Sequence, residues 1–344
     1  MEGKAELCFY ISSMFLTPFL LAGALVQAAD SGSAATKIPA AAAKTAKSAT
    51  AAAVKAPKTM VPSKDPEFDS TRAFRYLREQ CALGPRNPGG EGHHRAIDYF
   101  LAHFKSLGIP LQEQKFVHID MHSGEKVDLT NLIATVKGKD PKRKPVIFCA
   151  HWDTRPRADQ ESNAVLRGRP ILGANDGASG SAVLMELANL LKQKAPLQTV
   201  YLVLFDGEDY GSEGNIEEYF LGARYFADNL PAKNIDYALL LDMVGDKDLK
   251  LQMEDNSLRQ DPILVRKIWS VAQSLGLDAF QGGRGPNVLD DHMPLQAKGL
   301  HAVDIIDFEY PAWHTLGDTP DMCSARSLGM SGSLVASLAF RGLP

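Results

Sequence analysis

Histidines and acidic residues recur in this sequence beside short apolar runs. Zinc binds imidazole nitrogen and carboxylate oxygen in proteins, and a catalytic zinc keeps one position open for substrate. A carboxylate beside such a metal can also move protons. The residues concerned are His151 and Asp153 after the run 146–150, Asp176 before a segment with helical spacing, Glu208 and Asp209 after the run 200–205, and Asp242 after the run 238–241.

The neighbouring acids Glu208 and Asp209 are expected to have different roles. Adjacent residues just past the end of a strand can face different ways, so one can bind a metal while the other handles protons. Any one of these acids alone could be a helix cap or a solvated loop residue, and capping is the commoner role for a lone Asp176. The ordered set as a whole indicates a metal-dependent active site.

The elements that must position these side chains alternate along the chain. Short apolar runs predict buried strands, and longer amphipathic segments predict helices. This alternation predicts an α/β fold, a single-domain three-layer sandwich with a mixed, mostly parallel central sheet flanked by helices. Ligands bind at the carboxyl ends of the strands in such sheets, so the polar clusters should converge. The expected strands are 146–150, 200–205, 238–241 and 303–306, and the expected helices include 97–107, 183–191 and 264–275.

The first 64 residues differ in composition from the rest. Lys4 and the apolar stretch 7–26, followed by Ala28 and Ala29, predict a signal peptide over residues 1–28. The stretch is long enough to remain as a membrane anchor, which is the alternative. Residues 29–64, rich in Ala, Lys and Pro, predict a disordered linker. We therefore expect a secreted or periplasmic protein with its catalytic domain over residues 65–344.

Composition and missing motifs exclude several function classes. A net charge of -4 gives no indication of a nucleic acid partner. We expect no strong membrane partner unless the signal segment is retained. The sequence has no HExxH, GxSxG or P-loop motif. Cys81, Cys149 and Cys323 form no CxxC pair, so a thiolate zinc cluster is not expected, and their disulfide state stays open.

Two further segments have expected structures but no expected role. His93 and His94 should lie at the exposed start of a helix. The segment Gly282-Gly283-Arg284-Gly285 is expected to be a loop and not a phosphate cradle.

Taken in order, these motifs resemble the M28 metallopeptidase clan over about residues 68–340. The resemblance implies a zinc aminopeptidase-like fold and one of two activities. Aminopeptidases of the clan bind two zinc ions, and glutaminyl cyclases bind one. The matching motifs are Leu83-Gly84-Pro85-Arg86, His151-Trp152-Asp153, Asn175-Asp176-Gly177-Ala178-Ser179-Gly180, Glu208-Asp209, Asp242-Met243-Val244-Gly245, Asp291-His292 and His314-Thr315.

The two activities would use nearly the same residues. In an aminopeptidase, by resemblance, His151 and Asp242 would hold one zinc. Asp209 and His314 would hold the second, with Asp176 bridging both. In a glutaminyl cyclase, Asp176, Asp209 and His314 would hold the only zinc. Glu208 would transfer protons in either case. The set of ligand residues alone does not distinguish the aminopeptidase from the glutaminyl cyclase.

Details around the ligands resemble bacterial members of the animal-type glutaminyl cyclases. Trp313 precedes His314 directly, and Asp290 precedes Asp291 as a paired-aspartate motif. The implied function is the conversion of an N-terminal glutaminyl residue of a peptide or protein to pyroglutamate, with release of ammonia. Asp242 and Asp291 would orient and stabilise the reacting groups, and Trp313 would shape an apolar slot for the substrate side chain.

The chain departs from the animal enzymes at two points. They have Glu in place of Asp209, and they carry an active-site Trp in the following loop, whereas residues 211–219 here contain none. Tyr210, Tyr219 or Phe220 could supply the aromatic surface that this Trp offers to the substrate. The alternatives are a two-zinc aminopeptidase and, less favoured, a non-catalytic binding module on the same fold. Glu208 argues against the binding module, which needs no proton shuttle.

Overall fold

The computed structural model describes residues 65–344. The predicted signal peptide and linker lie outside the described residues, so these two assignments stay predictions. Within residues 65–344, no helix is both long and apolar enough to cross a membrane.

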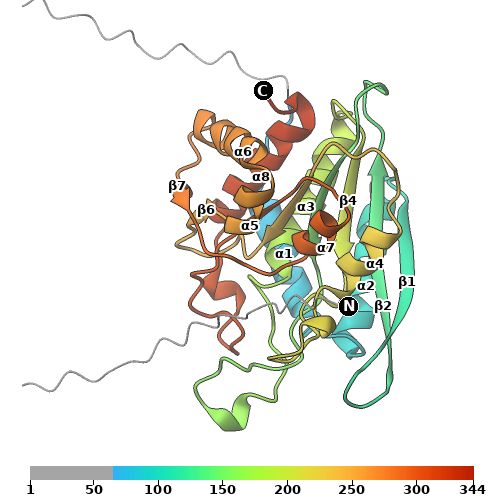
Figure 1. Ribbon diagram of the computed structural model, residues 1–344, viewed down its shortest axis with the longest axis vertical. Helices are drawn as coiled ribbons and strands as arrows, with labels where there is room; N and C mark the ends of the chain where they lie inside the picture. Colours follow the sequence, from blue (N-terminus) through green and yellow to red (C-terminus); the bar gives the residue numbers. More distant parts are fainter. Residues whose placement is uncertain (1–64) are drawn as a thin grey trace, which may run out of the picture. The chain divides into compact units, whose positions relative to one another are not determined.

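A six-stranded mixed sheet lies at the centre of the described part, in the order β1-β2-β4-β3-β5-β8 (Figure 1). The last four strands of this order are parallel, and β2 pairs antiparallel with both β1 and β4. A two-stranded parallel pair, β6 and β7, forms a second sheet. The strands are β1 (Leu111–Ile119), β2 (Lys126–Val136), β3 (Val146–His151), β4 (Val200–Phe205), β5 (Ala238–Asp242), β6 (Leu251–Met253), β7 (Phe280–Arg284) and β8 (Ala302–Ile306).

Helices cover both faces of the central sheet. On β3, Phe148 packs in the apolar core shared with α1, α2, α3 and α8, while its neighbour Cys149 packs in the core shared with α4 and α7. The alternation of side chains along a strand sends neighbouring residues to opposite faces. The helices are α1 (Ser70–Ala82), α2 (Glu91–Ser106), α3 (Ala178–Gln193), α4 (Leu221–Asp228), α5 (Asp255–Gln260), α6 (Pro262–Ser274), α7 (His292–Ala297) and α8 (Ala325–Arg341).

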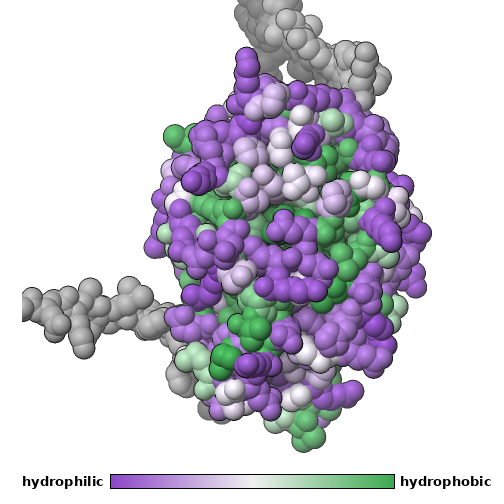
Figure 2. Space-filling view, turned by 90° about the vertical axis from the view of Figure 1, so that its right-hand side faces the viewer, coloured by the Kyte–Doolittle hydropathy of each residue, from purple (hydrophilic) through white to green (hydrophobic). Residues whose placement is uncertain are grey.

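These layers confirm the predicted fold class. The four parallel strands are nearly continuous apolar runs because helices bury them on both faces. The strands β1 and β2 were not indicated by such runs. Every residue of the edge strand β1 is exposed or half-buried, and Figure 2 shows many polar residues on the face on this side of the molecule.

One local prediction is wrong. The segment Gly282–Arg284, expected to be a loop, belongs to β7, which pairs with β6. Its residues are exposed, and the glycines have no apolar side chain to mark a strand. The pairing is supplied by a neighbouring segment that is distant in the sequence.

Close packing between α3 and β5 fixes the edge of the sheet where the polar clusters meet. A Cβ atom at Gly180 would lie 2.1 Å from the carbonyl oxygen of Leu241, so only glycine allows this approach. The start of α3 therefore lies directly against the carboxyl end of β5. Asp176, just before α3, and Asp242, at the end of β5, are brought together by this contact.

Candidate active site

Three residues from separate loops form a compact group that could hold a metal ion. Asp176, Asp209 and His314 each offer a ligand atom, and these atoms lie within 4.8 Å of one another. The Nε2 atom of His314 is 3.3 Å from Asp209 Oδ1 and 3.6 Å from Asp176 Oδ2. All three residues are buried. The structure thus brings together the three ligands that the sequence indicated for a single zinc.

Asp318 holds Asp176 in place through the backbone. Its Oδ1 atom accepts the N–H of Asn175 at 2.8 Å, and its Oδ2 atom accepts the N–H of Asp176 at 3.1 Å. The Tyr310 hydroxyl also donates to Asp318, at 2.7 Å. Burial and the nearby Asp176 raise the pKa of Asp318 to about 7. Asp318 and Tyr310 could not be recognised as site residues from the sequence, because their types and spacing carry no signal by themselves.

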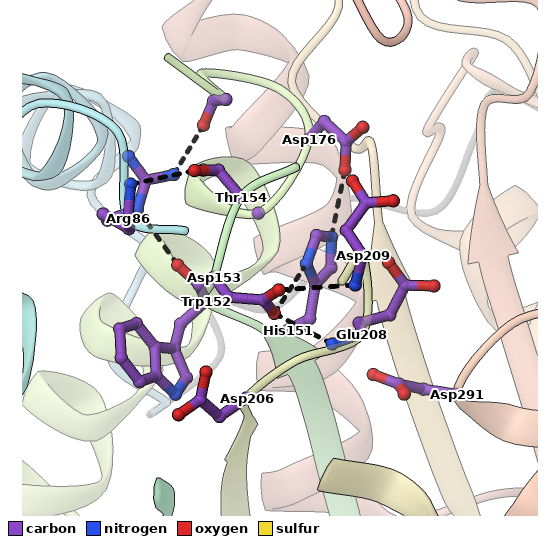
Figure 3. Close-up of polar contacts among 12 residues, drawn as sticks. Arg86, His151, Trp152, Asp153, Thr154, Asp176, Asp206, Glu208, Asp209 and Asp291 are labelled. Atoms are coloured by element: carbon purple, nitrogen blue, oxygen red, sulfur yellow. Dashed lines mark hydrogen bonds and ion pairs between the residues drawn. The ribbon is translucent and has the colours of Figure 1, made fainter. Parts of the chain in front are cut away.

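Asp153 fixes the turn that carries Glu208 and Asp209. Its two carboxylate oxygens accept the backbone N–H groups of Glu208 at 3.1 Å and Asp209 at 3.3 Å (Figure 3). The preceding Gly207 has a left-handed backbone, with φ of 71°. Asp209 on this turn contacts His314, and both Asp209 and Glu208 line the pocket described below.

Arg86, from the motif Leu83-Gly84-Pro85-Arg86, links two of the loops that carry the site. It is fully buried, and its guanidinium donates to the carbonyl oxygens of Trp152, Leu172 and Gly173 at 2.7–3.0 Å. Its own N–H donates to Thr154 Oγ1 (Figure 3). The loop after β3 and the loop before α3 are therefore tied together by one side chain.

A second group of possible ligands shares Asp176 with the first. The Nε2 atom of His151 lies 3.2 Å from both Asp176 Oδ1 and Asp242 Oδ1. Burial opposes a charge on His151, but Asp242 and the other neighbouring carboxylates outweigh burial and raise its pKa well above the ordinary value. An imidazolium here satisfies Asp242 through a direct hydrogen bond.

The first group leaves two buried carboxylate oxygens unpaired. In the first group, Asp176 Oδ2 and Asp209 Oδ2 are buried and have no hydrogen-bond partner among the described residues. Burying a carboxylate oxygen without a partner is costly, and a bound cation removes that cost. The donor set of two carboxylates and one imidazole also suits zinc with one open position. The first group therefore fits a zinc ion.

Opposing electrostatic effects separate the two neighbouring acids. Burial raises the pKa of Glu208 well above its ordinary value, and the charge of Asp209 adds to this effect. Burial would raise the pKa of Asp209 as well, but His314 and Arg155 outweigh it and lower that pKa. Burial alone would lower the pKa of His314, but Asp209 and Asp159 outweigh burial and raise this pKa to about 9. Glu208 is thus suited to carry a proton, and Asp209 to stay ionised.

The paired aspartates after β7 are both buried. Asp290 lines the pocket described below, whereas Asp291 does not belong to the pocket lining. Burial, together with Asp242 and other charges, raises the pKa of both well above the ordinary value. Asp291 was expected to act on the substrate, but Asp290 is the neighbour that lines the pocket.

A pocket of about 230 Å³ opens onto these residues. Its acidic lining consists of Glu208, Asp242 and Asp290 together with the two carboxylates of the first group. The rest of the lining is mainly apolar and forms a wall that contains Trp313, whose ring stacks on His314 with centroids 3.8 Å apart. Tyr219 and Phe220 belong to this wall, and Tyr210 does not. The apolar lining residues are Ile216, Tyr219, Phe220, Met243, Val288, Leu289, Ile306, Phe308 and Trp313.

The pocket also concentrates backbone strain. Phe220, Met243 and His314 are the only non-glycine residues with positive φ in the part of the chain that the structure describes, at 59°, 45° and 53°. All three line the pocket. Such conformations cost on the order of 1–3 kcal/mol each and cluster at functional sites. This strain marks the same pocket as the ligand geometry does.

The prediction for His93 is wrong, whereas His94 is exposed as expected. His93 is buried, and its Nε2 atom lies 3.0 Å from both oxygens of Asp206. Its ring also stacks on Trp152, with centroids 4.6 Å apart. His93 therefore packs against Trp152, the residue that directly follows His151 at the end of β3. A helix start that packs onto the sheet cannot be told from an exposed one by local sequence.

Three comparisons with known proteins bear on this site. The chain is 26% identical to a Drosophila melanogaster glutaminyl-peptide cyclotransferase, over 73% of this chain and 76% of that protein. It is 23% identical to aminopeptidase YwaD of Bacillus subtilis, over 82% of this chain but only 59% of that protein. It is 37% identical to the crystal structure of Fimbriiglobus ruber glutaminyl cyclase, with a TM-score of 0.73, covering 82% of this chain and 98% of that one.

Other similar structures include both glutaminyl cyclases and Zn-dependent exopeptidases. The relatives are therefore zinc-dependent enzymes, as the sequence predicted. The profile described as peptidase family M28 matches residues 131–339, more than half of the sequence. This match spans the strands and loops that carry Asp176, Asp209 and His314. The chain belongs to peptidase family M28.

Proposed function

We propose that this protein is a zinc-dependent glutaminyl-peptide cyclotransferase that converts N-terminal glutamine to pyroglutamate with release of ammonia. The observation that carries the proposal is the difference between the two ligand groups. Asp209, which belongs to the first group alone, leaves a buried carboxylate oxygen without a hydrogen-bond partner among residues 65–344, whereas Asp242, which belongs to the second group alone, is within hydrogen-bond distance of His151. A single metal suits cyclisation, because the nucleophile is the substrate's own amine and no water need be activated.

In this proposal, Asp176, Asp209 and His314 hold the zinc. The chemistry that zinc supplies when bound there is polarisation of the carbonyl group of the substrate side-chain amide. Glu208 takes a proton from the α-amine as its nitrogen bonds to the amide carbon. Glu208 then returns the proton to the amide nitrogen, which leaves as ammonia when the carbon–nitrogen bond breaks. Its raised pKa suits a group that must hold a proton between these steps.

The remaining acids act as a hydrogen-bonding surface. Asp242 and Asp290 line the pocket, and Asp291, the next residue after Asp290, is fully buried. Asp290 and Asp291 have raised pKa values, so they can share protons with Asp242 and donate hydrogen bonds to the reacting nitrogen atoms. We assign Asp290 a role beside Asp242 and Asp291 because it reaches the pocket.

The apolar wall would hold the methylene groups of the substrate side chain. Trp313 lies directly against His314, so it places this wall next to the proposed zinc. Tyr219 and Phe220 supply aromatic surface where residues 211–218 have no Trp. The expected substrates are peptides or proteins with a free N-terminal glutamine. Because residues 1–28 match a signal peptide, we propose a secreted or periplasmic location, with residues 29–64 as a linker.

A two-zinc aminopeptidase is the second candidate. The observation that favours it is that His151, Asp176 and Asp242 also offer ligand atoms within 4.8 Å of one another. The similarity to aminopeptidase YwaD supports the same reading. In that case Asp176 would bridge two zinc ions.

Zinc counting tied to activity tests the proposal. Purified protein is stripped of metal, titrated with zinc, and assayed for ammonia release from a glutaminyl peptide. We expect ammonia release to reach its maximum at about one zinc per chain. A maximum only at two zinc ions per chain, with release of free amino acids from peptides, would support the aminopeptidase.

A further inference from the structure

Arg155 lies in the loop after β3 and has no part in the proposed reaction. Its side chain is only 2% exposed, although it carries a permanent charge. Its Nη1 atom donates to Asp209 Oδ1 at 2.9 Å, and its Nε atom donates to both oxygens of Asp159 at 2.9 and 3.0 Å. One guanidinium thus joins a proposed zinc ligand to a second carboxylate.

Asp159 in turn contacts a second proposed ligand. Its Oδ1 atom lies 3.4 Å from His314 Nδ1, while His314 Nε2 faces Asp176 and Asp209. Histidines that bind metals usually give their other N–H to a carboxylate or carbonyl, which fixes the ring and its tautomer. A proton on Nδ1, held by Asp159, leaves the Nε2 lone pair free for zinc.

The guanidinium of Arg155 contacts only one of the two carboxylate oxygens of Asp209. Arg155 occupies Oδ1, whereas Oδ2 is buried without a hydrogen-bond partner among residues 65–344. Only one carboxylate oxygen is thus left free of hydrogen bonds for the metal. The Nη2 atom of Arg155 also donates to the Tyr219 hydroxyl at 2.8 Å, in the pocket wall. A lysine ammonium cannot reproduce this planar set of contacts.

We propose that Arg155 and Asp159 are positioning residues that set the zinc affinity of the site by fixing the orientations of Asp209 and His314. The proposal rests on the proposed ligand set, but not on which reaction the site catalyses. A purely electrostatic role makes the opposite prediction for Arg155. A cation beside the site repels zinc, so its removal would then strengthen zinc binding.

The test measures the dissociation constant of Zn²⁺ for the metal-free full chain by competition with a chelator. We expect Asp159→Asn to weaken zinc binding about 10–100-fold, the usual scale for groups that orient ligands. Arg155→Met should also weaken it, and Arg155→Lys should restore only part of the loss. The double variant of Arg155→Met and Asp159→Asn should bind zinc only slightly more weakly than the single variant with the lower zinc affinity. The reason is that Arg155 and Asp159 act through one ion pair.

A matched control separates positioning from loss of stability. Arg72→Met breaks another ion pair with a buried carboxylate, that of Glu186 at 2.6 Å, which lies outside the pocket lining. This variant should unfold more easily yet bind zinc as the wild type does. Should Arg155→Met fail to fold, Asp159→Asn and Arg155→Lys decide the question.

Asp209→Ala distinguishes the failure of this inference from the failure of the ligand set. If Asp209→Ala binds zinc as tightly as the wild type, the proposed ligands are wrong. If Asp209→Ala loses zinc while Asp159→Asn and Arg155→Met keep wild-type affinity, the ligands stand and the positioning role is refuted. Tighter binding by Arg155→Met would likewise refute it for Arg155.

Discussion

The indole ring of Trp313 stacks on the imidazole of His314, with ring centroids 3.8 Å apart and an angle of 26° between the planes. His314 has a left-handed backbone, with φ of 53°, which turns its side chain toward Asp176 and Asp209. A proposed metal ligand and the apolar wall of the pocket are therefore parts of one unit. Changes at Trp313 should affect substrate binding more than the metal.

Replacing Trp313 tests the apolar wall. We expect Trp313→Ala to lower kcat/KM for glutaminyl peptides at least about tenfold, the scale of lost apolar contacts in a binding pocket. Trp313→Phe keeps an aromatic face and should recover part of this loss. Zinc content should stay near that of the wild type in both variants. Wild-type kinetics for Trp313→Ala would show that the substrate does not use this wall.

Glu208 and Asp209 should respond differently to substitution. Glu208→Gln keeps the shape of the side chain but removes the base, so zinc should remain bound while turnover falls about a hundredfold or more. Asp209→Ala removes a proposed ligand and should lose zinc. Zinc content and ammonia release measured on both variants check this. Loss of zinc from Glu208→Gln and not from Asp209→Ala would mean that the two roles are reversed.

Removing the metal should lower the melting temperature. The unpaired buried oxygens of Asp176 and Asp209 favour a bound cation in the folded state. A ligand present at 100 times its dissociation constant stabilises the folded state by about 2.7 kcal/mol. Thermal unfolding with excess zinc and with chelator measures the shift. Asp209→Ala is the control and should show no shift, so an unchanged shift in that variant would place the stabilising metal elsewhere.

The pair of His93 and Asp206 should make stability depend on pH. Burial opposes a charge on His93, but Asp206 outweighs it and raises the pKa of His93 above 6.5. The imidazolium therefore stabilises the fold fully below pH 6.5, and this contribution disappears as pH rises through the folded pKa. Each unit of pKa shift corresponds to about 1.4 kcal/mol.

Urea unfolding of wild type and His93→Gln at a series of pH values checks this effect. The difference in free energy of unfolding should be largest near pH 6 and should shrink as pH rises. His94→Gln, at the exposed neighbouring position, is the control and should not change the profile. A difference that stays constant with pH would show that His93 acts through packing on Trp152 alone.

Residues 29–64 should be dispensable for activity, but Asp65 should not be removed. Asp65 accepts a hydrogen bond from Arg341 Nε at 2.9 Å and also pairs with Lys194, so it ties the chain before α1 to α8. A chain that begins at Asp65 should keep wild-type turnover and melting temperature, and a chain that begins at Ser70 should be less stable. Loss of folding in the chain that begins at Asp65 would mean that the preceding segment packs on the domain.

The sequence allowed prediction of the buried half of the fold. The strands β3, β4, β5 and β8 are apolar runs because both of their faces are covered, and such runs can be read locally. The edge strand β1 could not be found in this way, because most of its side chains face solvent. Its place in the sheet depends on pairing with β2, which no local pattern encodes.

The residues of the candidate site also differ in whether the sequence allowed their prediction. Asp209 follows an apolar run and Asp176 precedes a helical segment, and the resemblance to the M28 clan implied both of them and His314 as ligands. Asp318 and Arg155 were missed, since each is a single polar residue in a loop and only its contacts give it a role. Asp291 was expected to orient the reacting groups, but which of Asp290 and Asp291 lines the pocket depends on the backbone of the loop, which the sequence does not show.

The fate of one peptide tests the central claim most directly. Wild-type protein loaded with one zinc per chain is incubated with a peptide that begins with glutamine, and the products are identified by mass spectrometry. The account predicts a single product that has lost ammonia and keeps every peptide bond, and it predicts no such product with Glu208→Gln over the same period. Release of free glutamine and a shortened peptide would contradict the account and identify the protein as an aminopeptidase.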